Sequence, residues 1–349
     1  KTSTKEAVAT VLGAAMPTLK NEGNLNNEIG LPLTVLRLGS EHRAAVLEMG
    51  MYVGGEIRDL AAIGRPEIGV VTAVQPVHLS RIGTIEAIER AKGELVEALP
   101  ADGVAVLNAD DERVRRMASR TAARSILYGF ADDADVRAGR VESRGVAGMA
   151  FDLETRDGRR PVEIPTLGRM AVHNALAAAA VGLAAGIPID AIADSLSSGW
   201  SAPHRAHLVS AGGVTIVDDS YNASPGAVIA ALELLAGLPG RRIAVLGEML
   251  ELGDDHEDGH RRVGVAASDV VDRLVVVGDG ARGIADATTA PVDRVADRDA
   301  ARDRLVELLR PGDVVLVKAS RGVGLDVLVD ELAAALGGAT AAATEAPLG

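Results

Sequence analysis

The sequence contains no cysteine, and only 2% of its 349 residues are aromatic. The absence of cysteine excludes disulfide bonds, thiolate zinc sites and thiol nucleophiles, and it agrees with a cytoplasmic location. Any metal ion must therefore be held by oxygen or imidazole ligands. Because aromatic side chains are so few, the hydrophobic cores must be built by packing alanine, valine, leucine and isoleucine.

Positive charge is also scarce, since 36 lysines and arginines face 49 acidic residues and leave a net charge of −13. This balance argues against binding to a nucleic-acid backbone, which requires clustered basic side chains. The least polar stretch, 170–187, is mostly alanine and glycine and includes His173 and Asn174, so it predicts a buried helix and not a membrane span. We expect a monomer with no nucleic-acid or membrane partner.

The order of β-rich runs and helical patterns predicts an α/β fold. Residues 1–130 alternate the two, which is typical of βαβ units and a mostly parallel sheet. An antiparallel patch over 136–164 follows, with a hairpin turn at Asp157-Gly158. Turn formers over 197–204 mark a boundary, after which the alternation resumes. The expected parts are a P-loop-type parallel-sheet ATPase domain (1–200), a smaller Rossmann-like domain (201–337) and a disordered tail (338–349).

The chain starts with Lys1-Thr2-Ser3-Thr4, which has the form of the end of a phosphate-binding loop. In such loops the lysine reaches the β- and γ-phosphates and the next hydroxyl binds Mg²⁺. Residues 4–15 carry apolar side chains at helical spacing, as expected for a helix whose N-terminus faces an anion. The glycines that make this motif specific would lie before residue 1, so we expect a fragment cut inside its nucleotide site. A chance Lys-Thr pair is the alternative.

Three ionisable residues in the first part are candidates for metal chemistry. Glu48 closes a strand, where its carboxylate either reaches a nucleotide-bound Mg²⁺ or is a surface acid. His78 follows the next strand and either binds metal or is solvated. Lys92 falls on the apolar stripe of a helix over 84–99, where an ammonium is costly to bury. It either extends its charge to solvent or is held inward for a function.

Polar clusters in loops are candidates for substrate binding. Asn24, Asn26, Asn27 and Glu28 lie in a glycine-flanked loop, where amides either build turns or hold a polar substrate. In the second part, the run 218–225 follows a strand, with Ser224 and Pro225 predicted to start a helix. The basic pair Lys318 and Arg321, with Ser320 between them, ends a later strand. It either docks an anion or is solvated.

Together these stretches resemble the Mur ligase family, from residue 1 to about 336. The resemblance is carried by the lysine-threonine start, Gly23-Asn-Leu-Asn-Asn-Glu-Ile-Gly30, Glu48-Met-Gly50, Ala91-Lys-Gly-Glu94, Asn174-Ala-Leu-Ala-Ala, the 218–225 run, Leu246-Gly-Glu-Met-Leu-Glu-Leu-Gly253 and Val317-Lys-Ala-Ser-Arg321. The asparagine-rich loop, the 218–225 run and the 246–253 run are similar to a member that acts on UDP-N-acetylmuramoyl-tripeptide and D-alanyl-D-alanine.

The resemblance implies an ATP-dependent amide ligase that works through an acyl phosphate, with a first domain that this chain lacks. It implies catalytic roles for Lys1, His78 and Lys92, with Lys92 carbamylated. It implies Mg²⁺ ligands at Thr2, Glu48, His78 and Lys92. The implied nucleotide-binding residues are Lys1, Thr2, Ser3, Asn174, Arg205, Asp219, Tyr221 and Asn222. The implied substrate-binding residues are Asn24, Asn26, Asn27, Glu28, Lys318, Ser320 and Arg321.

The sequence departs from the usual family pattern in three places. Met170 stands near the position of a usual histidine, Ala73-Val74-Gln75 replaces an Asn-x-Gly stretch, and the final motif continues as Gly-Val-Gly-Leu-Asp. The alternatives are a related ligase for another amino acid or for glutamate, a phosphotransferase, and a non-catalytic nucleotide-binding fragment.

Overall fold

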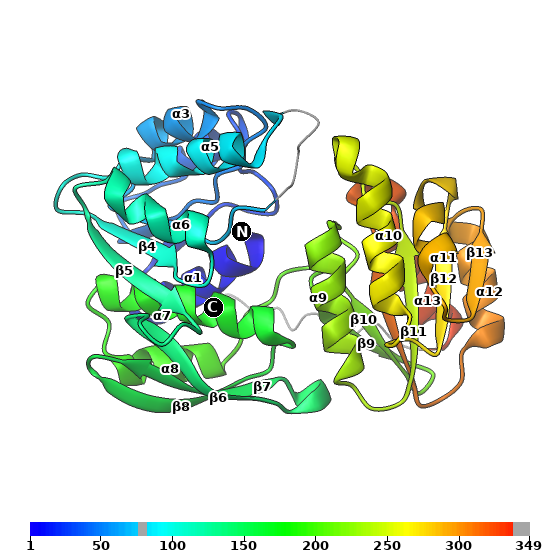
Figure 1. The fold of residues 1–349 in the computed structure, drawn as a ribbon. Coiled ribbons are helices and arrows are strands. Elements are labelled where there is room, and N and C mark those ends of the chain that lie inside the picture. Colours follow the sequence, from blue (N-terminus) through cyan, green and yellow to red (C-terminus); the bar gives the residue numbers. More distant parts are fainter. Residues whose placement is uncertain (76–81, 338–349) are drawn as a thin grey trace. The chain divides into compact units, whose positions relative to one another are not determined.

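The computed structural model describes residues 1–75 and 82–337 of the chain. It divides into two compact units between Ala202 and Pro203, and each unit has its own α/β sheet. The predicted α/β fold with mainly parallel sheets is confirmed (Figure 1). The expected disordered tail falls outside the described residues. None of the helices in the described ranges has both the length and the apolar character that a membrane crossing needs.

The first unit contains a six-stranded sheet in the order β3-β4-β5-β6-β7-β8, of which β3 to β6 are parallel and β6 to β8 antiparallel. A separate parallel pair joins β1 and β2. The strands are β1 (Thr18–Lys20), β2 (Ala44–Val46), β3 (Ile68–Val71), β4 (Val104–Asn108), β5 (Arg124–Gly129), β6 (Val136–Ser143), β7 (Met149–Thr155) and β8 (Gly158–Ile164). The helices are α1 (Thr2–Ala15), α2 (Gly30–Val35), α3 (Glu56–Gly64), α5 (Ile85–Glu97), α6 (Glu112–Arg116), α7 (Arg169–Ala184) and α8 (Ile189–Ser197).

Helices cover both faces of this sheet. Helices α1, α7 and α8 build one core with β4 to β8, and α5 and α6 build the other. The middle of α7 is completely buried, including Leu176 and a run of alanines, which confirms the predicted buried helix. Small side chains let α1 and α7 approach closely, because a Cβ at Gly182 would lie 2.8 Å from the Val11 side chain. This contact packs the second half of α1 against the last turn of α7.

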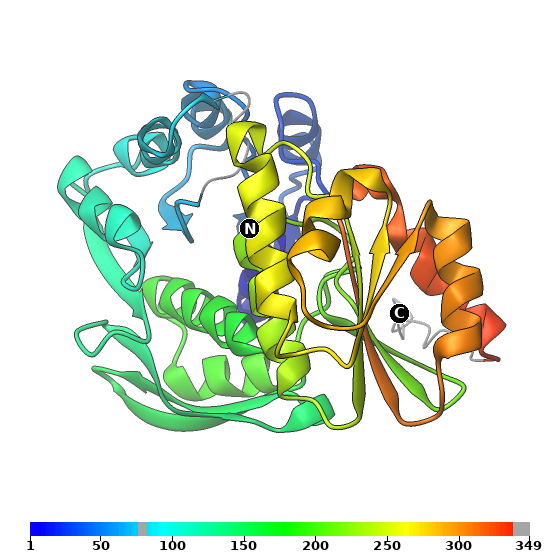
Figure 2. The same cartoon turned by 45° about the vertical axis from the view of Figure 1, so that its right-hand side comes forward.

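The second unit is an open sheet in the order β13-β12-β11-β14-β10-β9, parallel except for β9. Helices α9, α10 and α11 pack on one face and α12 and α13 on the other, which Figure 2 shows with the sheet nearly edge-on. The strands are β9 (His207–Ala211), β10 (Val214–Asp218), β11 (Arg241–Gly247), β12 (Arg273–Val277), β13 (Val292–Val295) and β14 (Asp313–Lys318). The helices are α9 (Pro225–Ala236), α10 (His256–Ala267), α11 (Arg282–Ala287), α12 (Arg298–Leu308) and α13 (Leu325–Ala335).

The predicted hairpin turn is displaced by one residue. Thr155 pairs directly with Gly158, so the two-residue loop is Arg156-Asp157 and Gly158 already belongs to β8. The Thr155 hydroxyl accepts a hydrogen bond from the Asp157 backbone N–H at 3.1 Å, and Gly158 takes a φ of +134° that suits glycine. The Asp-Gly pair therefore marked the hairpin correctly but not its register.

Candidate functional site

The start of α1 contacts α7, the helix that carries Asn174, one of the implied nucleotide-binding residues. Lys1 is the N-cap of α1, and the Thr4 hydroxyl donates a 2.8 Å hydrogen bond to Oδ1 of Asn174 on α7. Thr2 and Ser3 are half-buried in the first turn, whose backbone N–H groups point out of the helix start. Three of the predicted nucleotide-binding residues thus share one end of α1 with Asn174.

Glu48 lies two residues beyond the carboxyl end of β2 and is held at two points. Its backbone N–H donates to Oδ1 of Asn21 at 2.9 Å, and its Oε1 accepts from the Asn26 amide at 2.8 Å. The residue is 7% exposed, and its other oxygen, Oε2, is buried with no hydrogen-bond partner. Buried carboxylate oxygens are normally satisfied, so an open one is a position for a cation.

Lys92 is held inward on α5. Its ammonium donates to the backbone carbonyl of Ala73, just after β3. Burial, and next the positive charge of Lys1, lower the pKa of Lys92 from 10.5 to about 8, while the negative charge of Asp111 acts in the opposite direction. The repulsion from Lys1 shows that the two cations share one neighbourhood. The geometry therefore favours the inward interpretation of Lys92 over a side chain extended to solvent.

Asp111 is a supporting residue that the sequence analysis missed. Its Oδ1 caps α6 by accepting from the backbone of Arg113 and Val114, and its Oδ2 accepts from the Val74 N–H at 2.7 Å. The second bond fixes the segment whose Ala73 carbonyl faces Lys92. An aspartate immediately before a helix, three residues beyond the end of β4, was the available signal.

The residues present offer the ligand chemistry of a magnesium ion. Glu48 has one open oxygen, Thr2 a hydroxyl, and a carbamylated Lys92 would add two further oxygens, which are the hard ligands that Mg²⁺ takes. His78 lies outside the described residues. Across residues 1–75 and 82–337, no three His, Asp or Glu side chains gather into a metal-binding group. The metal assignments of these residues stay predictions.

The asparagine-rich loop is largely occupied by contacts within the protein. Oδ1 of Asn27 accepts from the backbone of Ile29 and Gly30 and so caps the start of α2, while Asn26 is bonded to Glu48. Asn24 and Glu28 are exposed. The side chain of Asn27 therefore builds the turn before α2, as the structural alternative predicted. A substrate contact from Asn24 or Glu28 stays a prediction.

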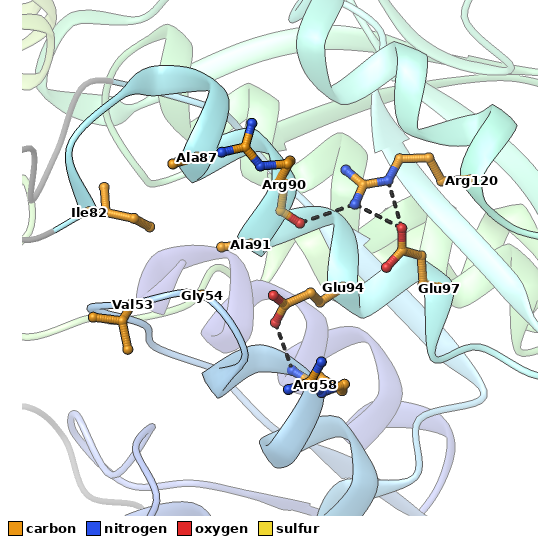
Figure 3. Close-up of a pocket in the computed structure, with 10 residues that line it drawn as sticks. All are labelled: Val53, Gly54, Arg58, Ile82, Ala87, Arg90, Ala91, Glu94, Glu97 and Arg120. Carbon is orange, nitrogen blue, oxygen red and sulfur yellow. Dashed lines mark hydrogen bonds and ion pairs between the residues drawn. The ribbon is translucent and has the colours of Figure 1, made fainter.

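A separate groove of about 450 Å³ lies between α3 and α5 (Figure 3). Glu94 on α5 accepts from the backbone N–H groups of Gly55 and Arg58 at the start of α3, and Arg120 donates to Glu97. Neither Glu48 nor Lys92 lines this groove. Glu94 thus joins α5 to the start of α3, while Glu97 joins α5 to the turn that ends at Arg120.

In the second unit, a lysine organises the segment after β10. The Lys318 ammonium is buried and donates to three oxygens: Oδ2 of Asp219 at 2.5 Å, the Asn222 carbonyl at 2.8 Å and the Asp219 carbonyl at 3.3 Å. Because all three N–H groups have acceptors, this geometry favours a structural role for Lys318. Its assignment to substrate binding stays a prediction, as does that of Ser320, whose hydroxyl accepts from the Leu250 backbone.

Two arginines flank Tyr221. The Arg205 guanidinium lies 4.3 Å from the centroid of the Tyr221 ring and that of Arg321 lies 5.1 Å away, and Arg321 also donates to the phenolic oxygen at 3.0 Å. Both contacts are cation–π geometry. They concentrate positive charge at the carboxyl edge of the sheet, where ligands of open α/β sheets bind.

The backbone around Arg205 is strained on both sides. His204 has a φ of 57° and Ala206 a φ of 51°, in the left-handed region that residues other than glycine rarely adopt. Each is held by an aspartate: His204 Nδ1 lies 2.7 Å from Asp218, and the Ala206 N–H donates to Asp219 at 3.2 Å. Such strain persists where the surroundings impose it, often at functional sites.

This strain gives a stability prediction. Replacing Ala206 with valine should destabilise the protein by about 1–3 kcal/mol, because a β-branched residue tolerates positive φ poorly. Replacing it with glycine should leave stability unchanged or slightly raised. Urea unfolding measures both, and Ala227→Val, in the helical backbone of α9, is the matched control, with an expected cost of about 0.5 kcal/mol. Equal losses for the two valine variants would contradict the argument.

The loop after β11 is anchored by a buried histidine. Nε2 of His260 accepts from the Met249 N–H at 2.9 Å, and its Nδ1 lies 2.6 Å from the His256 carbonyl, so the ring is neutral with its proton on Nδ1. The side chain of His256 in turn lies 3.0 Å from Glu248. Burial lowers the pKa of His260 below its ordinary value of 6.5.

A pH dependence of stability follows from His260. The depressed pKa means that the unfolded chain binds this proton more readily, so the stabilisation is complete above the ordinary pKa and is lost as pH falls toward the folded pKa. Between about pH 8 and about pH 5.5, we expect the melting temperature of His260→Gln to fall less than that of the unaltered protein. The amide oxygen of the introduced glutamine can still accept from the Met249 N–H. An identical fall in the variant and the unchanged protein would contradict it.

Comparison with known families agrees with the fold and with the motifs. A model described as the Mur ligase middle domain matches residues 1–182, and one described as the Mur ligase, glutamate ligase domain matches residues 204–321. The chain belongs to the Mur ligase family. The sequence-based resemblance is thereby confirmed.

Individual Mur ligases resemble the chain over nearly its whole length. The UDP-N-acetylmuramoyl-tripeptide--D-alanyl-D-alanine ligase of Mycobacterium tuberculosis is 41% identical, over 96% of this chain and 71% of that protein. MurF from Acinetobacter baumannii superimposes with a TM-score of 0.89 at 29% identity, covering 95% of this chain and 74% of that one. MurF from Thermotoga maritima, solved in complex with ADP, gives a TM-score of 0.88 at 28% identity, covering 96% and 78%.

One departure from the Mur ligase pattern has a structural counterpart. Met170 is 56% exposed, while His173, three residues on, points to the interior and lies 3.1 Å from Asp110. Burial lowers the pKa of His173. The ring is also packed edge-on against Tyr128 and Phe130. Sequence inspection placed His173 in a buried helix but found no partner for it.

Proposed function

We propose that the protein is an ATP-dependent ligase that joins D-alanyl-D-alanine to UDP-N-acetylmuramoyl-tripeptide in the synthesis of peptidoglycan precursors. The observation that carries the proposal is the 41% identity with a ligase of that name over 96% of the chain. The polar groups at the carboxyl ends of β2 and β3 and at the start of α1 agree with it, because phosphoryl transfer needs cations and oriented N–H groups at one place.

The proposed reaction has two steps. The γ-phosphoryl group of ATP passes to the terminal carboxylate of the tripeptide, which gives ADP and an acyl phosphate. The amine of D-alanyl-D-alanine then attacks the acyl carbon, forms the amide and releases phosphate. The first step brings two anions together, so it needs positive charge beside the phosphates.

Different residues of this chain would bind the phosphates, the nucleotide and the metal ion during phosphoryl transfer. Lys1 would reach the β- and γ-phosphates, and the N–H groups of the first turn of α1 would bind phosphate oxygens. Asn174, beside the same turn, would contact the nucleotide. Thr2, Glu48 and Lys92 would hold Mg²⁺, which supplies positive charge to the transferring phosphoryl group. In the second unit, Arg205, Tyr221 and Arg321 offer a cationic surface for an anionic part of a substrate.

An assay of the full-length protein with each substrate omitted in turn tests this proposal. ADP and phosphate should be released only when ATP, UDP-N-acetylmuramoyl-tripeptide and D-alanyl-D-alanine are all present, and mass spectrometry should find the amide product. Release with glutamate or another amino acid in place of the dipeptide would identify a different ligase. A stable phosphorylated product would identify a phosphotransferase. If neither ADP nor phosphate is released under any condition, the remaining alternative is a non-catalytic nucleotide-binding protein.

A further inference from the structure

Asn26 decides which oxygen of the Glu48 carboxylate is open. Its amide nitrogen donates to Oε1 at 2.8 Å, and Oε2 is left buried without a hydrogen-bond partner. The donor is neutral, so it fixes the orientation of the carboxylate without cancelling its charge, as a lysine or arginine partner would. A carboxylate held in this way keeps its full negative charge for a cation on the other oxygen.

The Asn26 side chain is itself fixed by its neighbours. Its backbone carbonyl accepts from the Gly50 N–H at 2.7 Å, so the loop is bonded to the same strand end that carries Glu48. Gly50 is required by this close approach, because a Cβ there would lie 2.8 Å from Oδ1 of Asn26. The amide therefore faces Glu48 from a constrained position.

Asn21 supports the arrangement from the interior. It is completely buried, and its side chain serves both the loop and Glu48: Oδ1 accepts from the Glu48 N–H and Nδ2 donates to the Leu25 carbonyl at 2.9 Å. Its backbone carbonyl accepts from the Lys5 ammonium at 2.6 Å. Asn21 thus joins the first turns of α1, the asparagine-rich loop and Glu48.

From this geometry we propose that Asn26, supported by Asn21 and Gly50, is a positioning residue that aims Oε2 of Glu48 at the catalytic divalent cation. The proposal rests on the proposed function, because that function places Mg²⁺ at Glu48. It assigns to Asn26 a role different from the substrate contact predicted from the sequence. Groups that orient a metal ligand typically change metal affinity about 10–100-fold when they are removed.

Metal binding without substrate distinguishes the two roles. Mn²⁺ is titrated into the full-length protein in the presence of ADP, and free Mn²⁺ is followed by electron paramagnetic resonance. Asn26→Leu, which keeps the shape but removes the donor, should weaken Mn²⁺ binding about 10–100-fold. Asn24→Leu, in the same loop with an exposed side chain, should leave Mn²⁺ binding unchanged. A residue that only contacts the tripeptide would not affect this measurement.

A second variant keeps the test decisive if Asn26→Leu folds poorly. Gly50→Ala displaces the Asn26 amide from the opposite side and should also weaken Mn²⁺ binding, with circular dichroism confirming the fold. Unchanged Mn²⁺ affinity in a folded Asn26→Leu or Gly50→Ala protein, or an equal loss in Asn24→Leu, would overturn the inference. Absence of Mn²⁺ binding in the unaltered protein would also overturn it, while the ligase assay would still judge the proposed function separately.

Discussion

Replacing Lys92 with alanine is expected to abolish amide formation by the full-length protein, with a fall in kcat of about 10³-fold or more. A metal site commonly contributes several kcal/mol of charge stabilisation to such a transition state, and each 1.4 kcal/mol is tenfold in rate. The lysine cannot act as a metal ligand while it carries a proton. It can do so after its neutral amine combines with carbon dioxide, forming a carbamate and releasing a proton.

The environment of Lys92 favours this modification. With a pKa of about 8, roughly half of the amine is neutral near that pH, whereas a lysine at 10.5 would be almost wholly protonated. Burial disfavours the ammonium and the charge of Lys1 adds to the effect. Carbamate formation converts a repulsive cation beside Lys1 into an attractive anion. Occupancy of the carbamate should therefore rise with pH up to and through this range at constant dissolved carbon dioxide.

Two measurements separate this role from a simple loss of packing. Nuclear magnetic resonance with ¹³C-bicarbonate should detect a carbamate in the unaltered protein and not in Lys92→Ala or Lys92→Arg, and added bicarbonate should not rescue either variant. Lys20→Ala removes another lysine of the same unit, one paired with Glu6, and should retain activity. Full activity of Lys92→Ala would refute the metal role.

The sequence predicted elements best where apolar periodicity was undisturbed. The buried helix that the run 170–187 predicts is found as α7, Arg169–Ala184. Helix α12 was missed because charged side chains fill most of its positions. Only three residues of α12 are buried: Ala301, Leu305 and Leu308. The one sequence signal for this helix was Asp297, which caps its start by accepting from the Ala300 N–H.

Site residues could be proposed from the sequence, but their partners could not. The apolar stripe of α5 singled out Lys92 as unusual, and the structure supplies the reason in Ala73, Lys1 and Asp111. Asn21 escaped notice because a lone asparagine after a short strand carries no pattern. Its importance comes only from the two distant segments that it joins, α1 and Glu48.

The role of Lys318 could not be decided from the sequence for the same reason, because its partners could not be predicted. A basic residue at the end of a strand has the same sequence signature whether it docks an anion or fills a buried cluster of acceptors. The structure shows the second arrangement around Asp219 and Asn222. By contrast, the guanidinium groups of Arg205 and Arg321 lie 4.3 Å and 5.1 Å from the centroid of the Tyr221 ring, so two positive charges are gathered around one aromatic side chain.

Replacing Glu48 with glutamine should lower kcat about 10²–10³-fold while leaving the fold intact, because the variant removes one charge that faces the cation. The amide oxygen of the introduced side chain would accept from Asn26 in place of Oε1, since two facing donors repel. That orientation turns the new NH₂ group toward the position of the open Oε2 and directs hydrogens at the metal. Raising the Mg²⁺ concentration should recover little activity.

Although its kcat should fall, Glu48→Gln should be at least as stable as the unaltered protein when no metal is bound. An ionised carboxylate with a buried, unpartnered oxygen is unfavourable when no cation is bound, and a neutral amide relieves that cost. In chelator-treated protein we therefore expect Glu48→Gln to melt at the same temperature as the unaltered protein or a higher one. With ADP and Mg²⁺ added, only the unaltered protein should gain substantially from metal binding. A residue kept for function at a cost to stability should, when replaced, lower activity without lowering the melting temperature. If Glu48→Gln is inactive and also melts at a lower temperature in chelator, Glu48 instead contributes to packing.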